Sequence, residues 1–484
     1  MSNFNSQEQM IYRSLAGQIQ LGFYQDGERF PTIQEIADRY GVSYCPAQRA
    51  LKELKKDGLI KVARGKETVV LDKPYDNYLE SAVFYQRRPA LKDLFYSLQL
   101  ISSSISFQGL CAVEEKDISR LPGIEHSCPP SMKRLYQLFN ISLDALGSRT
   151  VKSLYYDIGA FAESSFQDIL YAIYGKEKAG AYFNQLSETF LRSLKDCHAH
   201  HYIEGFNLLK GIEQKFFEDL EHYFTDCPAD SSDQIYQPFT WEPYKGRARY
   251  CDIIAMDLLR KINQGVYPVN TLLPRKSALA DMYHVSKITI RRTIELLDKL
   301  EITQTYNGIG TSVICKSDSS IPYRIKSLMT DDSFKMFLEA LQFLVITCEP
   351  VMQYTFTYCS PSSLDTIAAA ISTEEQLAAP TLITGACLQA VVHHCPLAAI
   401  REIYGKITLL LLNGSILHFN DSIPMQLPDW PDIRRQLSQS LDSRESGNFA
   451  AAFKRLSGDY FILMKKHLLK LDIAEVDNIC CPRS

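Results

Sequence analysis

The sequence of 484 residues predicts a mainly α-helical protein with two winged helix-turn-helix domains, each followed by an all-α helical bundle. The first observation is an internal repeat, because residues 30–70 and 273–313 match without a gap at a constant spacing of 243 positions. The second is the helical spacing of apolar residues in the long segment after each copy, where the alternation typical of strands is scarce. Together they predict a tandem pseudo-repeat of two mainly helical halves.

The elements of the first copy can be placed from their capping residues. A stripe of apolar residues predicts a helix within residues 6–22. Thr32 and Glu35 match a capping box, so a second helix is expected to begin there. Ser43 is expected to cap a third helix, with Pro46 in its first turn, where a missing N–H costs nothing. Two short strands, residues 59–62 and 68–71, then form the wing. The predicted buried face of the third helix consists of Ala47, Ala50, Leu51 and Leu54.

The second copy repeats this frame from residue 241 onward. Val42-Ser43 corresponds to Val285-Ser286, and Arg49 corresponds to Arg292. The repeat then continues into the helical segments, where the spacing drifts from 243 to 247 positions. Single hydrophobic cores rarely exceed ~250–300 residues, so several domains are expected. We predict winged helix-turn-helix domains at residues 1–74 and 241–316, and helical bundles for sensing or dimerisation at residues 75–240 and 317–484.

Positive charge is concentrated in the repeated units. Residues 244–316 hold 12 Lys and Arg against 6 Asp and Glu, whereas residues 1–73 hold 11 against 9. The whole chain nevertheless has a net charge of −4, so the other segments are acidic. Basic units joined to acidic ones are typical of a DNA reader coupled to a part that does not touch DNA.

Double-stranded DNA is therefore the expected partner. The second helix of a helix-turn-helix enters the major groove with its N-terminal residues at base edges, and a wing reaches phosphates or the minor groove. The alternative is that these polar residues only form a solvated helix face. The candidate DNA-contacting residues are Gln34, Tyr44, Gln48, Arg49, Lys52, Arg64 and Gly65 in the first copy, and Arg275, Lys276, Lys287, Thr289, Arg291, Arg292, Asn307 and Gly308 in the second.

Both copies resemble the winged helix-turn-helix of the GntR family of bacterial transcription regulators. The family pattern is present in the second copy as Ile262 to Gly265, Leu273-Pro274, Val285-Ser286 and Gly308 to Thr311. The first copy keeps most of it but has Lys66-Glu67-Thr68 at the end of the wing pattern. At two positions where family members often have arginine, the first copy has Gln34 and Tyr44, and the second has Ser277 and Lys287. The operator sequences of family members therefore cannot be transferred to this chain.

Other function classes find little support in the sequence. No nucleophile–base arrangement is visible, so no enzyme, catalytic residue or cofactor is expected. Asp196 and His200 have a metal-ligand spacing, but only His222 follows on a later helix of the bundle, and surface or hydrogen-bonded histidines are the expected explanation. The 13 cysteines lack CxxC pairs and are interpreted as reduced thiols in a cytoplasmic protein. No apolar run is long enough to span a membrane.

The resemblance implies a regulator that binds palindromic operators as a dimer. Our hypothesis is a sequence-specific transcription regulator that carries both half-site readers in one chain, as a pseudo-dimer. The alternative is that one winged helix is a protein-interaction or structural module and only the other binds DNA. A small-molecule effector in the helical bundles and a homodimer both stay open.

Overall fold

The structure is a computed structural model, which describes most of the chain. The described residues are 7–20, 24, 27–62, 67–71, 78–114, 131–162, 164–226, 236–243, 250–263, 265–314, 331–373, 379–414, 427, 429–470, 473 and 476–483. The wing candidates Arg64 and Gly65 lie outside them. The fold is mainly α-helical, as predicted.

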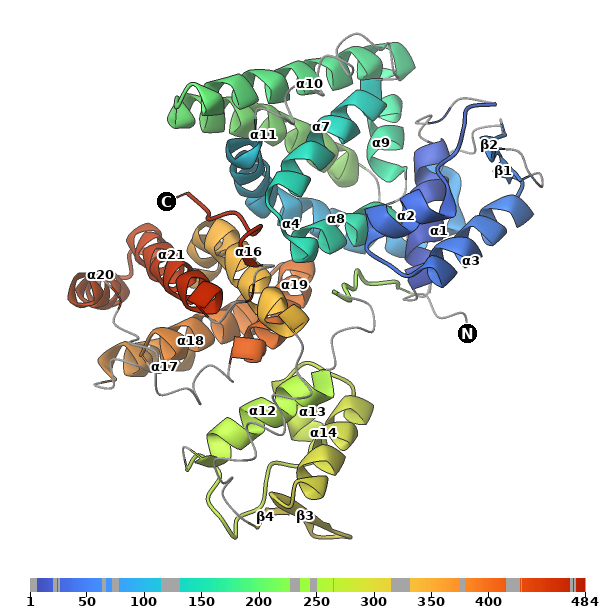
Figure 1. The fold of residues 1–484 in the computed structure, drawn as a ribbon. Helices are drawn as coiled ribbons and strands as arrows, with labels where there is room; N and C mark the ends of the chain where they lie inside the picture. Colours follow the sequence, from blue (N-terminus) through green and yellow to red (C-terminus); the bar gives the residue numbers. More distant parts are fainter. Residues whose placement is uncertain are drawn as a thin grey trace. The chain divides into compact units, whose positions relative to one another are not determined.

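The chain divides into two compact units, residues 1–245 with 397–399, and residues 246–396 with 400–484. Each unit contains one winged helix-turn-helix and one helical segment (Figure 1). This division agrees with a tandem arrangement of two halves, whereas the finer division into four domains stays a prediction.

The two winged units have the same elements in the same order. The first contains α1 (Gln7–Gln20), α2 (Ile33–Tyr40), α3 (Tyr44–Lys56), β1 (Ile60–Lys61) and β2 (Val69–Val70). The second contains α12 (Tyr250–Asn263), α13 (Lys276–Met282), α14 (Lys287–Lys299), β3 (Thr303–Tyr306) and β4 (Gly310–Val313). Each pair of strands forms a two-stranded antiparallel sheet.

The repeat extends to individual backbone pairings. Ile60 lies opposite Val70 in the first wing, and Thr303 lies opposite Val313 in the second. A third segment adds one bridge to each wing, Arg29 to Val69 and Leu272 to Ser312. Every strand pairing and bridge of the first wing recurs in the second at a shift of 243 positions, so the sequence repeat is also a structural repeat.

Local chemistry explains where the helices begin, and it corrects one prediction. Thr32 and Glu35 form the predicted capping box at the start of α2. Ser43 stands at the N-cap of α3, but its side chain makes no capping hydrogen bond. The reason is Pro46, which occupies the third helical position and has no N–H to donate. In the second unit Ser286 accepts a hydrogen bond from the Thr289 amide at 3.2 Å.

Helices α3 and α14 are the second helices of the two helix-turn-helix motifs, and we call them the recognition helices. Each packs its apolar face against the two helices before it. The predicted buried residues of α3 are all buried, and the counterpart face of α14 consists of Ile290, Thr293, Ile294 and Leu297. In the first unit Tyr156 of the helical segment also packs against this core. Its ring lies 4.7 Å from that of Tyr40 between centroids, and its hydroxyl donates to the Arg39 carbonyl. The first winged unit is therefore packed against its helical segment.

The helical segment of the first unit is all-α in its described residues. It begins with a short 3-10 turn, η1 (Tyr78–Glu80). The helices are α4 (Ala82–Ala112), α7 (Ser131–Ala145), α8 (Arg149–Ala162), α9 (Ser165–Tyr174), α10 (Lys176–His198) and α11 (Tyr202–Asp226). Helices α10 and α11 lie side by side and both pack on α4 (Figure 1). Arg87 is buried in this segment, where it donates to the Phe161 carbonyl at 2.8 Å and to the Tyr78 hydroxyl at 3.2 Å.

The helical segment of the second unit has a related plan. Its helices are α16 (Asp331–Phe356), α17 (Pro361–Ser372), α18 (Ala379–His394), α19 (Ala398–Leu411), α20 (Trp430–Asp442) and α21 (Ser446–Lys470). A shift of 247 positions brings α7 and α8 almost onto α18 and α19, so the repeat includes these helices. None of the described helices of the chain is long and apolar enough to cross a membrane.

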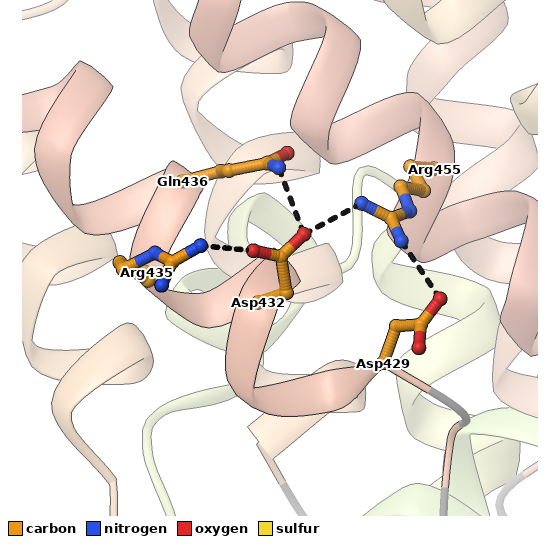
Figure 2. A network of polar contacts seen from close by, with 5 residues as sticks. All are labelled: Asp429, Asp432, Arg435, Gln436 and Arg455. Carbon is orange, nitrogen blue, oxygen red and sulfur yellow. Dashed lines mark hydrogen bonds and ion pairs between the residues drawn. The ribbon is translucent and has the colours of Figure 1, made fainter.

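A polar network fixes the start of α20 against α21. Arg455 of α21 donates to Asp432 at 2.9 Å and to Asp429 at 2.8 Å (Figure 2). Asp432 also accepts hydrogen bonds from Arg435 and Gln436 on its own helix. The carboxylates lie at the N-terminal end of α20, where the helix dipole favours negative charge.

Glu213 of α11 makes the stability of the first helical segment dependent on pH. It is 9% exposed, accepts a hydrogen bond from Ser103 at 2.7 Å, and burial raises its pKa to about 7. An acid with a raised pKa in the folded state binds its proton more tightly there, so its stabilising contribution is lost as the pH rises towards and past 7.

We therefore predict that Glu213→Gln raises the unfolding temperature at pH 8 and changes it little at pH 5. At pH 8 the substitution should raise the free energy of unfolding by roughly 1–3 kcal/mol, because a pKa shift of one unit is worth about 1.4 kcal/mol. Calorimetric scans of both proteins at the two pH values measure it. Glu218→Gln, an exposed change on the same helix, is the control. Equal pH dependence of Glu213→Gln and the unmodified chain would contradict the assignment.

Candidate nucleic-acid interface

The exposed face of α3 in the first unit borders a groove of about 990 Å³ between the helix and the wing. Five of the predicted DNA-contacting residues line it, namely Gln34, Tyr44, Gln48, Arg49 and Lys52. All five side chains are exposed to solvent. The structure therefore brings the described candidates of this unit together on one face. Gln34 lies on α2, and the other four lie on the exposed side of α3, whose opposite side is buried.

Carboxylates neutralise part of the positive charge around this groove. Arg49 forms an ion pair with Glu8 of α1 at 3.1 Å. Arg29, at the base of the wing, pairs with Glu35 at 3.4 Å and with Glu67 at 3.5 Å. The backbone N–H of Thr32 donates to Glu35 and lowers the pKa of that carboxyl, so it stays ionised at neutral pH. These carboxylates would repel a DNA phosphate.

The second unit presents its candidates on the equivalent elements. Arg275 and Lys276 lie at the start of α13, and Lys287, Arg291 and Arg292 are exposed on α14. Thr289 is different, because it is only partly exposed and its hydroxyl lies 2.9 Å from that of the capping Ser286. A hydrogen bond from the Thr289 hydroxyl to DNA would therefore compete with its hydrogen bond to Ser286.

Most of the candidate DNA-contacting cations of the second unit have no carboxylate partner among the described residues. Arg291 pairs with Glu295 one turn further along the same helix, at 3.4 Å. Among the described residues, Arg275, Lys276, Lys287 and Arg292 form no ion pair. The positions equivalent to the three carboxylates of the first unit explain the difference. Glu8, Glu35 and Glu67 correspond to Cys251, Ala278 and Gly310.

The wing of the second unit ends in a tight turn that carries two candidates. Asn307 and Gly308 are both exposed between β3 and β4. Gly308 has φ of +79°, a left-handed conformation that glycine adopts without strain. The amide of Ile309 donates to the Tyr306 carbonyl at 3.2 Å and closes the turn.

Exposed apolar side chains next to these cations were not among the predicted contacts. Ile288, near the start of α14, is 58% exposed, and Ile309, in the wing turn, is 70% exposed. Apolar side chains at such positions can contact the methyl group of thymine. The signal was present in the sequence for Ile288, which lies off the apolar stripe of an amphipathic helix.

The Asp196–His200 motif of the first helical segment is not part of a metal-binding cluster in the described residues. His200 lies 2.6 Å from the Tyr202 hydroxyl through its Nδ1 atom. Within the part of the chain that the structure describes, no group of three or more His, Cys, Asp or Glu side chains is arranged to hold a metal ion.

Comparison with known proteins assigns both winged units to one family. Residues 7–70 and 252–313 each match the family described as bacterial regulatory proteins, gntR family. A curated relative, the Uxu operon regulator of Haemophilus influenzae, is 29% identical over 114 residues, and the match covers 24% of this chain and 42% of that regulator.

Solved structures of GntR proteins overlap with less than half of this chain. The GntR protein of Streptococcus agalactiae has 18% identity and a TM-score of 0.22, and the match covers 44% of this chain and 98% of that one. A GntR family member from Pseudomonas syringae pv. tomato has 15% identity and a TM-score of 0.19, with coverage of 46% and 88%. By the two family matches in its sequence, this chain carries two tandem winged helix-turn-helix domains of the GntR family of bacterial regulatory proteins.

Proposed function

We propose that the chain is a sequence-specific DNA-binding transcription regulator that reads two half-sites with the two winged helices of one polypeptide. The second reader, α14 with its wing, would supply most of the affinity. The observation that carries this proposal is that four candidate cations of the second winged unit form no ion pair among the described residues, whereas Arg29 and Arg49 of the first unit are paired. The name of the Haemophilus relative, an operon regulator, supports a role in transcription.

Double-stranded DNA would be held mainly by phosphate contacts. Each neutralised phosphate releases counterions, so a reader with unpaired cations binds more tightly at low salt than one whose cations are already paired. Arg292 and Lys287 would also reach base edges, because the N-terminal part of a recognition helix lies deepest in the major groove. A regulator of this kind would act in the cytoplasm, and the helical segments would serve in sensing or assembly.

A second possibility is that the first winged helix has become a structural or protein-interaction module. Two observations favour it. Tyr156 of the helical segment packs into the core of that unit, and Arg49 is held by Glu8. Both possibilities keep the second winged helix as a DNA reader, and they differ in what the first contributes.

Charge reversal on the two recognition helices distinguishes them. Arg291→Glu combined with Arg292→Glu should weaken binding to a selected DNA site by at least 100-fold, because two cations are replaced by two repelling charges. Gln48→Glu combined with Arg49→Glu should weaken binding by about tenfold if the first unit is a reader, and not at all if it is a structural module. Fluorescence anisotropy at fixed salt measures both, and thermal unfolding checks that the variants fold. Full affinity of the second-unit variant would contradict the proposal.

Removal of the Glu8 carboxylate tests directly whether its ion pair with Arg49 lowers the DNA affinity of the first unit. We expect Glu8→Gln to raise DNA affinity several-fold and to steepen the dependence of log affinity on log salt by about one, as for one added phosphate contact. Glu53→Gln is the control. It removes the same charge and frees Lys56 near the end of α3, but it leaves the Arg49–Glu8 pair intact. Equal effects of the two substitutions would show that only net charge matters.

A further inference from the structure

A second cavity of the first unit lies between the winged helix and the helical segment, and it shares Arg29 with the groove beside α3. Its volume is about 680 Å³. Gln18, Tyr24 and Arg39 line it from the winged unit, and α7 and α8 line it from the helical segment. We call it the Tyr24 cavity. Figure 1 shows α8 beside α1, and the two helices are in contact.

The lining of the Tyr24 cavity is polar and has a surplus of positive charge. Its four cationic residues, Arg29, Arg39, Lys133 and Lys152, face only two acidic ones, Glu35 and Asp144. Arg29 pairs with Glu35, and Lys152 pairs with Asp144. Lys133 pairs with Glu28, which is not part of the lining.

Arg39 is the cation of this lining without a carboxylate partner among the described residues. Its guanidinium donates to the Tyr24 hydroxyl at 3.3 Å, and no ion pair holds it. The Lys133 ammonium lies 5.6 Å from the centre of the same Tyr24 ring. Two cations from different parts of the unit therefore flank one tyrosine. A guanidinium and an ammonium placed in this way favour a carboxylate or a phosphate.

Neutral polar side chains complete the lining. The amide residues Gln18, Gln137 and Asn140 line the cavity together with the cations. An amide group can both donate to and accept from a hydroxyl group. The lining therefore suits a ligand that carries hydroxyl groups, while its acidic group lies at Arg39.

The second unit shows that the winged helix-turn-helix does not need these residues for its own fold. The tyrosines are kept, since Tyr24 and Tyr40 correspond to Tyr267 and Tyr283. The charged residues are not kept, since Arg39 corresponds to Met282. Arg29 likewise corresponds to Leu272. The cationic lining is thus specific to the first unit, which is expected if it binds something that the second unit does not.

We propose that the Tyr24 cavity is a binding site for a small hydroxylated organic anion, whose acidic group lies between Arg39 and Lys133. The site connects α2, the helix before the first recognition helix, to the helical segment. A bound anion would therefore stabilise one placement of the first reader, by its greater affinity for that placement. Binding itself is measured without DNA, so its failure would be distinct from a failure of the proposed function.

Isothermal titration of the full chain tests the site with citrate and glycerol 3-phosphate, and with glycerol as the uncharged control. At least one anion should bind with 1:1 stoichiometry, and glycerol should not. If citrate alone binds, the site accepts carboxylates, and if glycerol 3-phosphate alone binds, it accepts phosphates. Failure of both anions to bind would overturn the proposal.

Two substitutions then locate the bound anion. Arg39→Met introduces the residue that the second unit carries at the same position, so the fold should tolerate it, and it should weaken binding at least tenfold. Arg275→Met removes the same charge from an exposed site of the second unit and should leave binding unchanged. Equal affinity of Arg39→Met and the unmodified chain, or equal losses in both variants, would overturn the proposal.

Discussion

The packing of each recognition helix against the two helices before it is the constraint from which the rest of the candidate interface follows. In α3 this packing buries Ala47, Ala50 and Leu54, and in α14 it buries Ile290, Ile294 and Leu297. A helix with one buried face must present its other side chains to solvent, since residues three and four apart share a face. The same scaffold thus exposes a different set of side chains in each copy.

The difference between the copies is electrostatic rather than architectural. Strand register, bridges and capping positions are repeated at one constant spacing, whereas the carboxylates that hold Arg29 and Arg49 have no acidic counterparts in the second unit. Exposed ion pairs contribute little to stability, so these pairs are poorly explained as stabilising features. They do change how much charge the first reader can offer to a phosphate. A duplicated fold can in this way acquire two unequal readers without any change of backbone.

Much of the fold could be predicted from local patterns. The capping box at Thr32, the buried face of α3 and the two-stranded wings all depend on residues close in sequence. The missing cap at Ser43 could also have been anticipated, because Pro46 removes the amide that the serine would bind. The ion pair of Arg49 with Glu8 could not be predicted, because it arises only when α1 packs against α3. The Tyr24 cavity likewise depends on the approach of α7 and α8 to the winged unit.

The central claim is that the two winged helices read DNA unequally within one chain. Selection of bound DNA from a random library by the full-length chain, at a fixed salt concentration, tests it most directly. We predict an asymmetric site, with one strongly specified half and a weakly specified or variable second half at a fixed distance. A symmetric palindrome with two equally specified halves would contradict unequal reading, and the absence of any enriched sequence would contradict specific DNA binding.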